Sequence, residues 1–276
     1  MKIIDAFTFF NEIDLLKIRL EFLYNHVDHF IICESNVTHS GAPKPWNYLD
    51  NISSLEAYKD KIIYVQYAPN ISEYDFTIKD KEFNENAASW QLERGQRNYI
   101  SNFLGSFNSE DVVIISDADE IWNPELANLI RNNSQIEMAR LELQFNYYYL
   151  NCRGIGKLNN SWTSSYLSRI SRLGGSPDLS KLRTQESLPI IGNAGWHFSY
   201  LGGIESIIDK IESFAHQELN FDAIKDRLRL QACLERGLDF LNRPGYEWAF
   251  HPIDYYPPDL GLLMRKNTHL VRTDLK

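Results

Sequence analysis

Three acidic residues follow one strand that is expected to be buried. Residues 112–115 are Val-Val-Ile-Ile, an apolar β-branched run typical of a strand covered on both faces. Asp117, Asp119 and Glu120 come next, at the carboxyl end of the strand, where open α/β sheets bind their ligands. Strand side chains alternate, so Asp117 and Asp119 point to the same side and repel each other unless a cation lies between them. A divalent cation carrying substrate phosphates is the usual partner. The alternative is a polar turn that leads into a helix at residues 123–125.

Composition limits the class of protein. The chain has 276 residues, 43% of them hydrophobic, and a net charge of -9, which argues against a general nucleic-acid partner. Its aromatic share of 13% suits both core packing and sugar stacking. Cys33, Cys152 and Cys233 lack metal-site spacing and indicate a reducing compartment. No signal peptide or membrane-spanning run is visible, so we expect a cytoplasmic protein without a transmembrane segment.

The first half of the chain alternates strands and helices. This pattern predicts an α/β fold with a parallel sheet and helices on its faces. Residues 67–86 show no clear period and are predicted to form a loop over a site. The predicted strands are residues 3–10, 29–34, 62–66 and 112–115, and the predicted helices are residues 12–24 and 87–104.

The second half changes character without a low-complexity linker. Strands are predicted at residues 138–150, 162–172 and 195–200, helices at 204–214 and 221–236, and an extended segment at 244–258. We therefore expect a single domain over residues 1–276. Its nucleotide-binding half would cover about residues 1–122 and its acceptor-binding half about residues 123–276.

Polar side chains follow the first two strands at the same sheet edge as the acids. Asn11 and Glu12 come after the first strand and could bind a nucleobase or ribose hydroxyls, although Asn11 also suits a helix N-cap. Glu34 ends the second strand and could bind the ribose or base, or simply be solvated. These three residues are candidates for donor binding.

A predicted helix carries two arginines near this edge. Arg94 and Arg97 lie close together on residues 87–104, with Asn98 adjacent. Guanidinium groups suit phosphate through bidentate geometry. The alternative for Arg97 is an ion pair with Glu93 or with an aspartate at the strand end. All three polar residues of this helix are donor-binding candidates.

Several segments of the chain form a pattern through their order and spacing. They are 5–12 (DAFTFFNE) with 14–16 (DLL), 34–36 (ESN) with 43–45 (PKP), 96–98 (QRN), 116–121 (SDADEI) and 195–199 (GWHFS). Together these segments resemble glycosyltransferase family 17. The resemblance implies a GT-A fold, which is a Rossmann-like mixed sheet with helices on both faces. It also implies a nucleotide-sugar donor such as UDP-N-acetylglucosamine, and inversion at the anomeric carbon.

The resemblance also implies roles for the acidic strand end and for a late histidine. Asp117 and Asp119 would bind the metal, Mn²⁺ or Mg²⁺, and the donor diphosphate, with Asp119 the stronger candidate for the metal. His197 would complete the metal coordination, or else is a core residue. Glu120 would orient the donor sugar or begin the next helix, and Trp196 would stack on a sugar ring or fill the core.

An inverting transfer needs a carboxylate base near the acceptor hydroxyl. Glu218 follows a predicted helix end and is the first candidate, with Glu212 the second. Residues 210–218 also look like a family segment. His216 could assist either carboxylate or contact the donor diphosphate.

The sequence thus predicts an inverting, metal-assisted glycosyltransferase. It would move N-acetylglucosamine from its UDP donor to a hydroxyl of a glycan or lipid-linked glycan, in polysaccharide biosynthesis and with peripheral membrane association. One alternative is a nucleotidyltransferase, but this needs a glycine-rich loop after the first strand, and residues 7–14 contain no glycine. A non-catalytic glycan-binding module would explain the aromatic residues but not the acids at the strand end.

Overall fold

A computed structural model describes residues 1–77, 82–175 and 177–274 of the chain, so residues 78–81 of the predicted loop 67–86 lie outside the described residues. Within these ranges one sheet contains β1 (Ile3–Phe9), β2 (His29–Ser35), β3 (Ile62–Tyr67), β4 (Val112–Asp117), β5 (Glu120–Trp122), β6 (Met138–Tyr147), β7 (Cys152–Gly154), β8 (Ser161–Trp162), β9 (Tyr166–Arg169), β10 (Ile190–Ser199) and β11 (Trp248–Phe250). The α-helices are α1 (Ile13–Leu23), α2 (Asn47–Asp50), α3 (Ala88–Tyr99), α4 (Ser101–Leu104), α5 (Glu125–Asn132), α6 (Ile170–Leu173), α7 (Leu179–Leu182), α8 (Gly203–Ser213), α9 (Arg227–Arg236) and α10 (Pro258–Lys266). Short 3₁₀ helices cover Ile52–Lys61, Ile71–Glu73, Gln217–Leu219, Ile253–Tyr255 and Thr268–Leu270.

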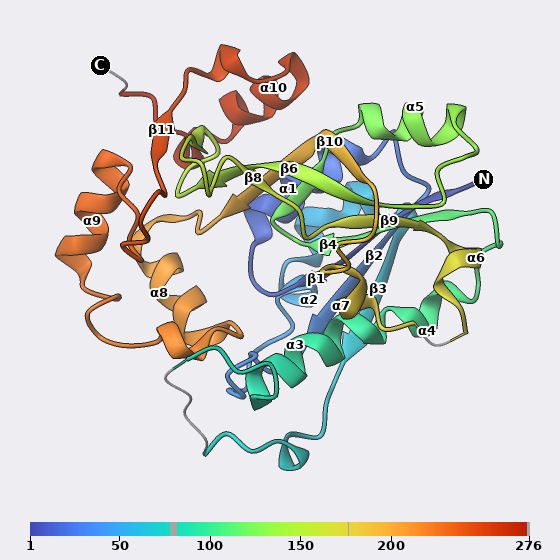
Figure 1. The fold of residues 1–276 in the computed structure, drawn as a ribbon, viewed down its shortest axis with the longest axis horizontal. Helices are drawn as coiled ribbons and strands as arrows, with labels where there is room; N and C mark the ends of the chain where they lie inside the picture. Colours follow the sequence, from blue (N-terminus) through green and yellow to red (C-terminus); the bar gives the residue numbers. More distant parts are fainter. Residues whose placement is uncertain (78–81, 176, 275–276) are drawn as a thin grey trace.

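The main path of the sheet runs β11-β7-β6-β9-β4-β1-β2-β3 (Figure 1). β1 pairs in parallel with β2 on one side and with β4 on the other, and β3 extends the parallel part beyond β2. This confirms the parallel sheet predicted for the first half. The chain therefore builds outward from β1 through β2 to β3 and returns to place β4 on the opposite side of β1. In open α/β sheets a ligand binds where the strand order reverses in this way.

Helices cover both faces of this parallel part. Ile3 and Phe7 of β1 pack with the apolar side of α1, whereas Ile4 and Ala6 of the same strand pack with Ile100 and Leu104 near α3 and α4. The alternation follows from the two-residue period of a strand. It confirms the predicted α/β fold with a Rossmann-like sheet between helical layers.

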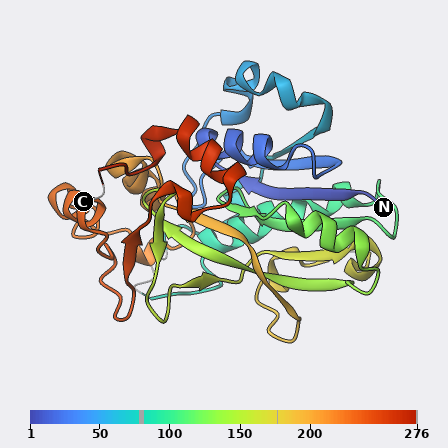
Figure 2. The same cartoon turned by 90° about the horizontal axis from the view of Figure 1, so that it is seen from above.

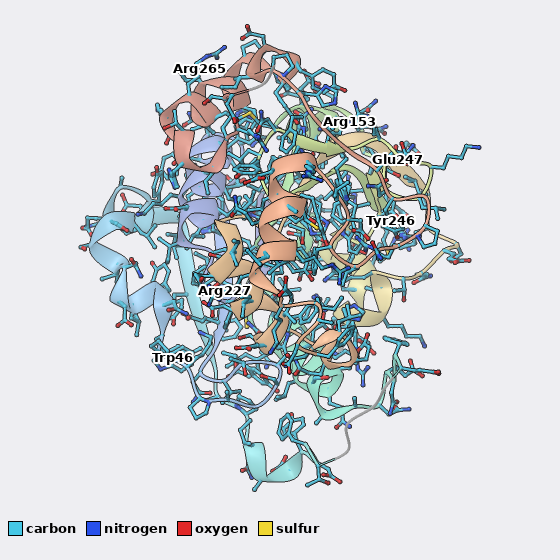
Figure 3. The ribbon with its side chains drawn as sticks, turned by 90° about the vertical axis from the view of Figure 1, so that its left-hand side faces the viewer. Trp46, Arg153, Arg227, Tyr246, Glu247 and Arg265 are labelled. Atoms are coloured by element: carbon cyan, nitrogen blue, oxygen red, sulfur yellow. The ribbon has the colours of Figure 1, made fainter. Side chains whose placement is uncertain are left out.

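The second half adds mixed pairing and its own aromatic core. β6 is parallel to β10 but antiparallel to β9, β8 and β7. Tyr147, Phe240 and Trp248 pack together here, with stacked rings whose centroids are 4.3 Å apart for Tyr147 and Trp248. Ile207 of α8 and Leu230 of α9 pack in the same cluster. Figure 3 views this side of the molecule, with Arg227 of α9 and Arg265 of α10 at the surface.

The first and the last α-helix of the chain pack together in the main core. α10 lies against α1, and Leu260 and Met264 of α10 are fully buried among core residues (Figure 2). No helix of the described ranges is both long enough and apolar enough to cross a bilayer.

Several predicted elements are wrong at their boundaries. The strand predicted at residues 195–200 is the end of the longer β10, which begins at Ile190, and the strand predicted at 138–150 ends at Tyr147. The strand predicted at residues 162–172 is broken into β8 and β9 and ends at Arg169, whose side chain donates to the carbonyls of Ile136 and Ser134. The helix predicted at 221–236 begins only at Arg227, because the Asp226 carboxylate caps the amide of Arg229 at 2.8 Å. The helix predicted at 87–104 is divided into α3 and α4.

Candidate functional site

A cavity of about 1130 Å³ lies at the carboxyl ends of β1 and β4. Thr8 of β1 stands opposite Asp117 of β4 in the parallel register, and both side chains line the cavity. Other parts of the wall come from α3, α7, α8, the ends of β6 and β10, the loop after β2 and the segment after α8. The cavity therefore lies where the order of the parallel strands reverses, as expected for the ligand site of such a sheet.

Asp117 is bound by two arginines. Its Oδ1 accepts from Thr8 Oγ1 at 2.9 Å and from Arg97 Nη2 at 2.7 Å, and its Oδ2 accepts from Arg183 Nη1 at 2.7 Å. Burial by itself would raise the pKa of Asp117, but Arg183 and Arg97 outweigh it and hold this pKa well below its usual value. Arg97 also pairs with Glu93, so both ion pairs considered for Arg97 from the sequence are present.

Glu120 lies outside the cavity wall and holds the acidic segment, residues 117–120, in place. It is 1% exposed and begins β5, while the following helix begins only at Glu125. Its carboxylate accepts from Arg183 at 2.8 Å, Trp162 Nε1 at 2.6 Å and Ser165 Oγ at 2.7 Å. It also accepts the backbone amide of Asp117 at 2.9 Å, so it fixes the turn between β4 and β5.

Asp119 points into the cavity toward a different cation. Its Oδ2 accepts from Lys210 Nζ of α8 at 2.7 Å and lies 3.5 Å from Nε2 of His197. Although burial opposes ionisation of Asp119, Lys210 and then His197 lower its pKa. The His197 ring stacks on Phe145 with centroids 4.8 Å apart, and its buried Nδ1 has no hydrogen-bond partner.

Two of the three predicted metal ligands lie close together, and the third does not. Asp119 and His197 approach each other, whereas both carboxylate oxygens of Asp117 are bound by arginines. In the described ranges no group of three or more His, Cys, Asp and Glu side chains is arranged to hold a metal, so the three predicted ligands are not gathered as one set. One or two protein ligands are enough where substrate phosphates supply the others. The residues therefore suit a cation shared with a diphosphate.

The charge of the cavity differs from that of the whole chain. The net charge of the sequence is -9, whereas the described wall of the cavity carries as many basic as acidic side chains, so the cavity is less negative than the chain as a whole. Burial would lower the pKa of Lys210, but Asp119 and Glu12 raise it, and the ammonium stays charged. The basic residues of the wall are Lys44, Arg94, Arg97, Lys181, Arg183, Lys210 and Arg243.

A histidine and a carboxylate lie at another part of the wall. His216 Nδ1 and Glu218 Oε1 are 2.6 Å apart, and both residues line the cavity. The His216 ring packs edge-on against Trp90, with centroids 4.6 Å apart. Glu212, the second candidate for the base, instead pairs with Lys225 at 2.7 Å and is absent from the cavity lining.

The structure brings together only part of the predicted site. The cavity wall includes Glu12, Arg94, Arg97, Asp117, Asp119, His197, His216 and Glu218. Outside the wall are Asn11, Glu34, Asn98, Glu120, Trp196 and Glu212.

These outlying residues have other contacts. Asn11 is exposed and borders a smaller neighbouring cavity of about 130 Å³. Glu34 is fully buried and accepts from Lys44 at 2.6 Å and from the amides of the helix start that follows. Asn98 binds the amide of Ser180 at 3.0 Å and so ties α7 to α3. Trp196 packs in the main core, edge-on to Phe22 at 6.0 Å.

The sequence did not predict the two cations, Arg183 and Lys210, that bind the acidic side chains together with Arg97. Arg183 follows a short helix in a segment without periodicity, so no local pattern marks it. Lys210 did carry a signal, because it lies three residues after Ile207 and one before Ile211, on the buried side of α8. A lysine on the apolar side of an amphipathic helix is a candidate for a buried ion pair.

Three curated proteins that resemble the chain carry the same name. The β-1,4-mannosyl-glycoprotein 4-β-N-acetylglucosaminyltransferases of Rattus norvegicus and Homo sapiens are each 31% identical to the chain over 124 residues. The match covers 44% of this chain, and 21% of the rat and 22% of the human protein, so it spans about a fifth of these relatives.

Two solved structures show a distant likeness that carries no argument about function. HddC from Yersinia pseudotuberculosis has a TM-score of 0.40 and 11% identity, covering 70% of this chain and 92% of that chain. Mannose-6-phosphate isomerase from Helicobacter pylori has a TM-score of 0.34 and 10% identity, covering 62% of this chain and 72% of that chain.

The family itself is shown by a match over most of the sequence. The family model described as glycosyltransferase family 17 matches residues 1–256, which include every predicted site residue. The chain therefore belongs to glycosyltransferase family 17.

Proposed function

We propose that this glycosyltransferase transfers N-acetylglucosamine from UDP-N-acetylglucosamine to a glycan hydroxyl, with inversion and with the help of Mn²⁺ or Mg²⁺. The observation that carries the proposal is the meeting of Arg97, Arg183 and Lys210 with two strand-end carboxylates in one cavity. Such a set of fixed charges suits a nucleotide diphosphate. The printed names of the curated relatives support the choice of sugar.

The chain's own cations would hold the leaving group. Lys210 and the two arginines would stabilise the negative charge on the diphosphate as the bond from the anomeric carbon to phosphate oxygen breaks. Asp119 and His197 would hold the divalent cation, which would neutralise further charge on the same phosphates. Glu120 and Asp117 keep Arg183 in place through ion pairs of 2.8 and 2.7 Å.

Glu218 is the proposed general base. The acceptor oxygen attacks the anomeric carbon as UDP leaves from the opposite side, and the hydroxyl proton passes to the Glu218 carboxylate. A single in-line displacement of this kind inverts the configuration. The hydrogen bond from His216 would orient the carboxylate. Aromatic wall residues such as Phe145 and Trp162 offer flat apolar faces for sugar rings of a free or lipid-linked glycan. We propose a cytoplasmic setting in polysaccharide assembly.

The donor is tested with purified protein. A panel of nucleotide sugars is screened by thermal shift and by donor hydrolysis, with Mn²⁺, with Mg²⁺ and with a chelator. We expect UDP-N-acetylglucosamine plus metal to give the largest stabilisation and slow hydrolysis. If no UDP-sugar is bound or hydrolysed under any of these conditions, the proposal is wrong.

The role of Asp119 is tested by one pair of variants. Asp119→Ala should lower donor hydrolysis by about 100-fold or more, because the divalent cation that neutralises the leaving diphosphate would lose a protein ligand. The control is Asp254→Ala, which removes an exposed aspartate paired with Arg265 and should leave hydrolysis unchanged. Activity retained in Asp119→Ala, in a protein with the wild-type circular dichroism spectrum, would contradict the assignment.

A further inference from the structure

The amide of Gln96 can adopt only one orientation. Gln96 lies on α3 and is 4% exposed. Its Nε2 is 2.8 Å from the carbonyl oxygen of Cys33 and 3.3 Å from that of Phe9, at the ends of β2 and β1. Carbonyl oxygens only accept hydrogen bonds, so the NH₂ group must face them. The side-chain oxygen of Gln96 is then directed at His39.

This orientation determines which nitrogen of His39 carries the proton. Nε2 of His39 is 3.0 Å from Oε1 of Gln96. An amide oxygen cannot donate, so Nε2 must be the donor. Burial lowers the pKa of His39, although the nearby Glu93 acts in the opposite direction, and the ring is therefore neutral. In a neutral ring with a proton on Nε2, Nδ1 has a lone pair and acts as an acceptor.

No described protein group occupies that lone pair. His39 lines the cavity and is half-buried, and the described residues provide no polar partner for its ring other than Gln96. The tautomer of His39 is imposed by two main-chain carbonyls, through the fixed amide of Gln96. The acceptor is thus a fixed property of this part of the cavity.

The loop that carries His39 is held by its own hydrogen bonds. Thr38 donates its amide to the Ala42 carbonyl at 2.8 Å and accepts at Oγ1 from the Ala42 amide at 2.9 Å. Val37 and Pro43 form an antiparallel bridge at the base of the loop. Gly41 has a φ of +89°, and a Cβ there would lie 2.6 Å from the ring of Phe76, so the turn needs glycine.

The position of His39 relative to the charged residues points to a nucleobase. His39, Gln96 and Arg97 all line the same cavity. Gln96 contacts His39, and the next residue of α3, Arg97, binds Asp117. The wall near His39 also contains Phe9, Phe10 and Val37, whose apolar groups suit a flat base. A nucleotide whose diphosphate lies at Arg97 and Lys210 could extend its base toward the ends of β1 and β2.

We propose that Nδ1 of His39 accepts a hydrogen bond from a ring N–H of the donor nucleobase and so selects the base. Uracil and thymine present such an N–H at N3, and guanine presents one at N1. Cytosine and adenine have an unprotonated acceptor nitrogen at the corresponding position, and two facing lone pairs repel. The inference rests on the proposed function, since it assigns the base of the proposed UDP donor to one acceptor.

The test compares pyrimidine nucleotides of equal charge, two of nearly equal size and one that carries an added methyl group. Isothermal titration calorimetry at pH 7.5 with Mn²⁺ measures the Kd of UDP, CDP and N3-methyl-UDP for the wild-type protein. We expect CDP and N3-methyl-UDP to bind roughly 5- to 100-fold more weakly than UDP, the range for leaving a hydrogen-bonding group unpaired. The methylated nucleotide tests the N–H directly, without any change to the protein.

Two variants test whether His39 causes the preference for UDP over CDP. His39→Ala should bind UDP and CDP within about twofold of each other, because the acceptor is gone. His216→Ala removes another histidine of the same cavity and should keep the wild-type ratio of UDP to CDP affinity, whatever its effect on either Kd. Circular dichroism confirms that both variants are folded.

The outcomes separate this inference from the proposed function. If the wild type binds UDP and CDP equally, or binds N3-methyl-UDP as tightly as UDP, His39 does not select the base, but the proposed UDP donor is not contradicted. His39 also does not select the base if His39→Ala still binds UDP more tightly than CDP. If no nucleotide or UDP-sugar binds at all, the proposed donor is wrong, and this inference is wrong with it.

Discussion

Arg183 connects the two halves of the acidic segment through separate nitrogens. Nη1 binds Asp117 at 2.7 Å and Nη2 binds Glu120 at 2.8 Å, and the guanidinium side chain is only 9% exposed. A lysine has a single ammonium and cannot reproduce this planar geometry. Arg183 therefore affects the stability of the segment as well as its charge.

Replacing Arg183 should be costly. We expect Arg183→Met to lower the free energy of unfolding by about 3 to 5 kcal/mol, because Glu120 is left buried without its cation. Arg183→Lys should recover part of this loss. Urea unfolding at pH 7.5 gives the values.

The matched control is Arg227→Met. Arg227 pairs with Glu205, and both side chains are more than half exposed (Figure 3). Exposed pairs contribute little, so the change should be below about 1 kcal/mol. Equal effects at the two positions would mean that the contacts of Arg183 add nothing to stability.

Glu12 gives a pH-dependent prediction. Burial raises its pKa, Asp119 adds to this, and Lys210 opposes it without cancelling it. A folded-state pKa above the unfolded value means that the folded protein binds the proton more tightly, so this residue's contribution to stability falls as pH rises above about 4.5. Glu12→Gln has no such titration.

We therefore expect Glu12→Gln to be more stable than the wild type at pH 7.5. The difference should shrink as pH falls and disappear below the unfolded pKa. Thermal melting from pH 4 to 8 measures it. A difference that is constant over this range, or that grows toward low pH, would show that the pKa of Glu12 is not raised in the folded protein.

Local sequence predicted the acids of the site better than their partners. Asp117 and Asp119 follow an apolar strand, and the two-residue period is enough to place both at the sheet edge. Arg183 reaches Asp117 across 66 residues of sequence, and Lys210 reaches Asp119 across 91. Such pairs depend on tertiary packing, which single-residue patterns do not contain. The same holds for His39, whose tautomer depends on two strand ends and a helix.

At the scale of elements, the contact between β10 and β5 depends on one glycine. Gly195 pairs with Trp122 and has a φ of +149°, and a Cβ there would lie 2.3 Å from the Ile121 carbonyl oxygen. His197 follows two residues later, opposite Glu120. The close approach of these strands therefore helps to set the position of His197 beside Asp119.

Gly195→Ala should force the two strands apart. We expect a loss of about 1 to 3 kcal/mol in the free energy of unfolding, as for other overpacked positions, together with weaker UDP binding. Gly192→Ala on the same strand is the control, because its Cβ would meet only a flexible Glu142 carboxylate at 3.3 Å. Equal stability of the two variants in urea would contradict the tight contact.

Element types were easier to predict than element ends. The strands of the parallel part were found because each is a short apolar run. The segment 162–172 is predicted as one strand, but Arg169 ends β9 by binding carbonyls outside its strand, and a helical turn follows. Nothing in the local sequence distinguishes an arginine that binds distant carbonyls from an exposed one.

At the scale of the whole molecule, the segment beyond residue 256 belongs to the main core. The family match ends at residue 256, yet Leu260 and Met264 of α10 are fully buried against the same core as α1. Their contacts join the last helix of the chain to the first. The unfolding of α10 should therefore be part of the global transition.

Leu260→Ala tests this connection. We expect it to lower the free energy of unfolding by about 2 to 5 kcal/mol, the range for a large-to-small change in a packed core. Leu262→Ala, on the same helix but 54% exposed, should change it by less than about 0.5 kcal/mol. A separate early transition in Leu260→Ala, with the main one unchanged, would show that α10 unfolds on its own.

The buried Arg19 of α1 has a further consequence. It is 0% exposed, binds Asp5 with two nitrogens, and donates to the carbonyl oxygens of Asp117 and Glu120, each at 2.8 Å. The backbone of the acidic turn is thus immobilised by the scaffold before any ligand arrives. Its conformational entropy is lost during folding, so a donor need not offset that loss when it binds. Part of the affinity of this site is therefore determined by a residue of the first helix that lies outside the cavity wall.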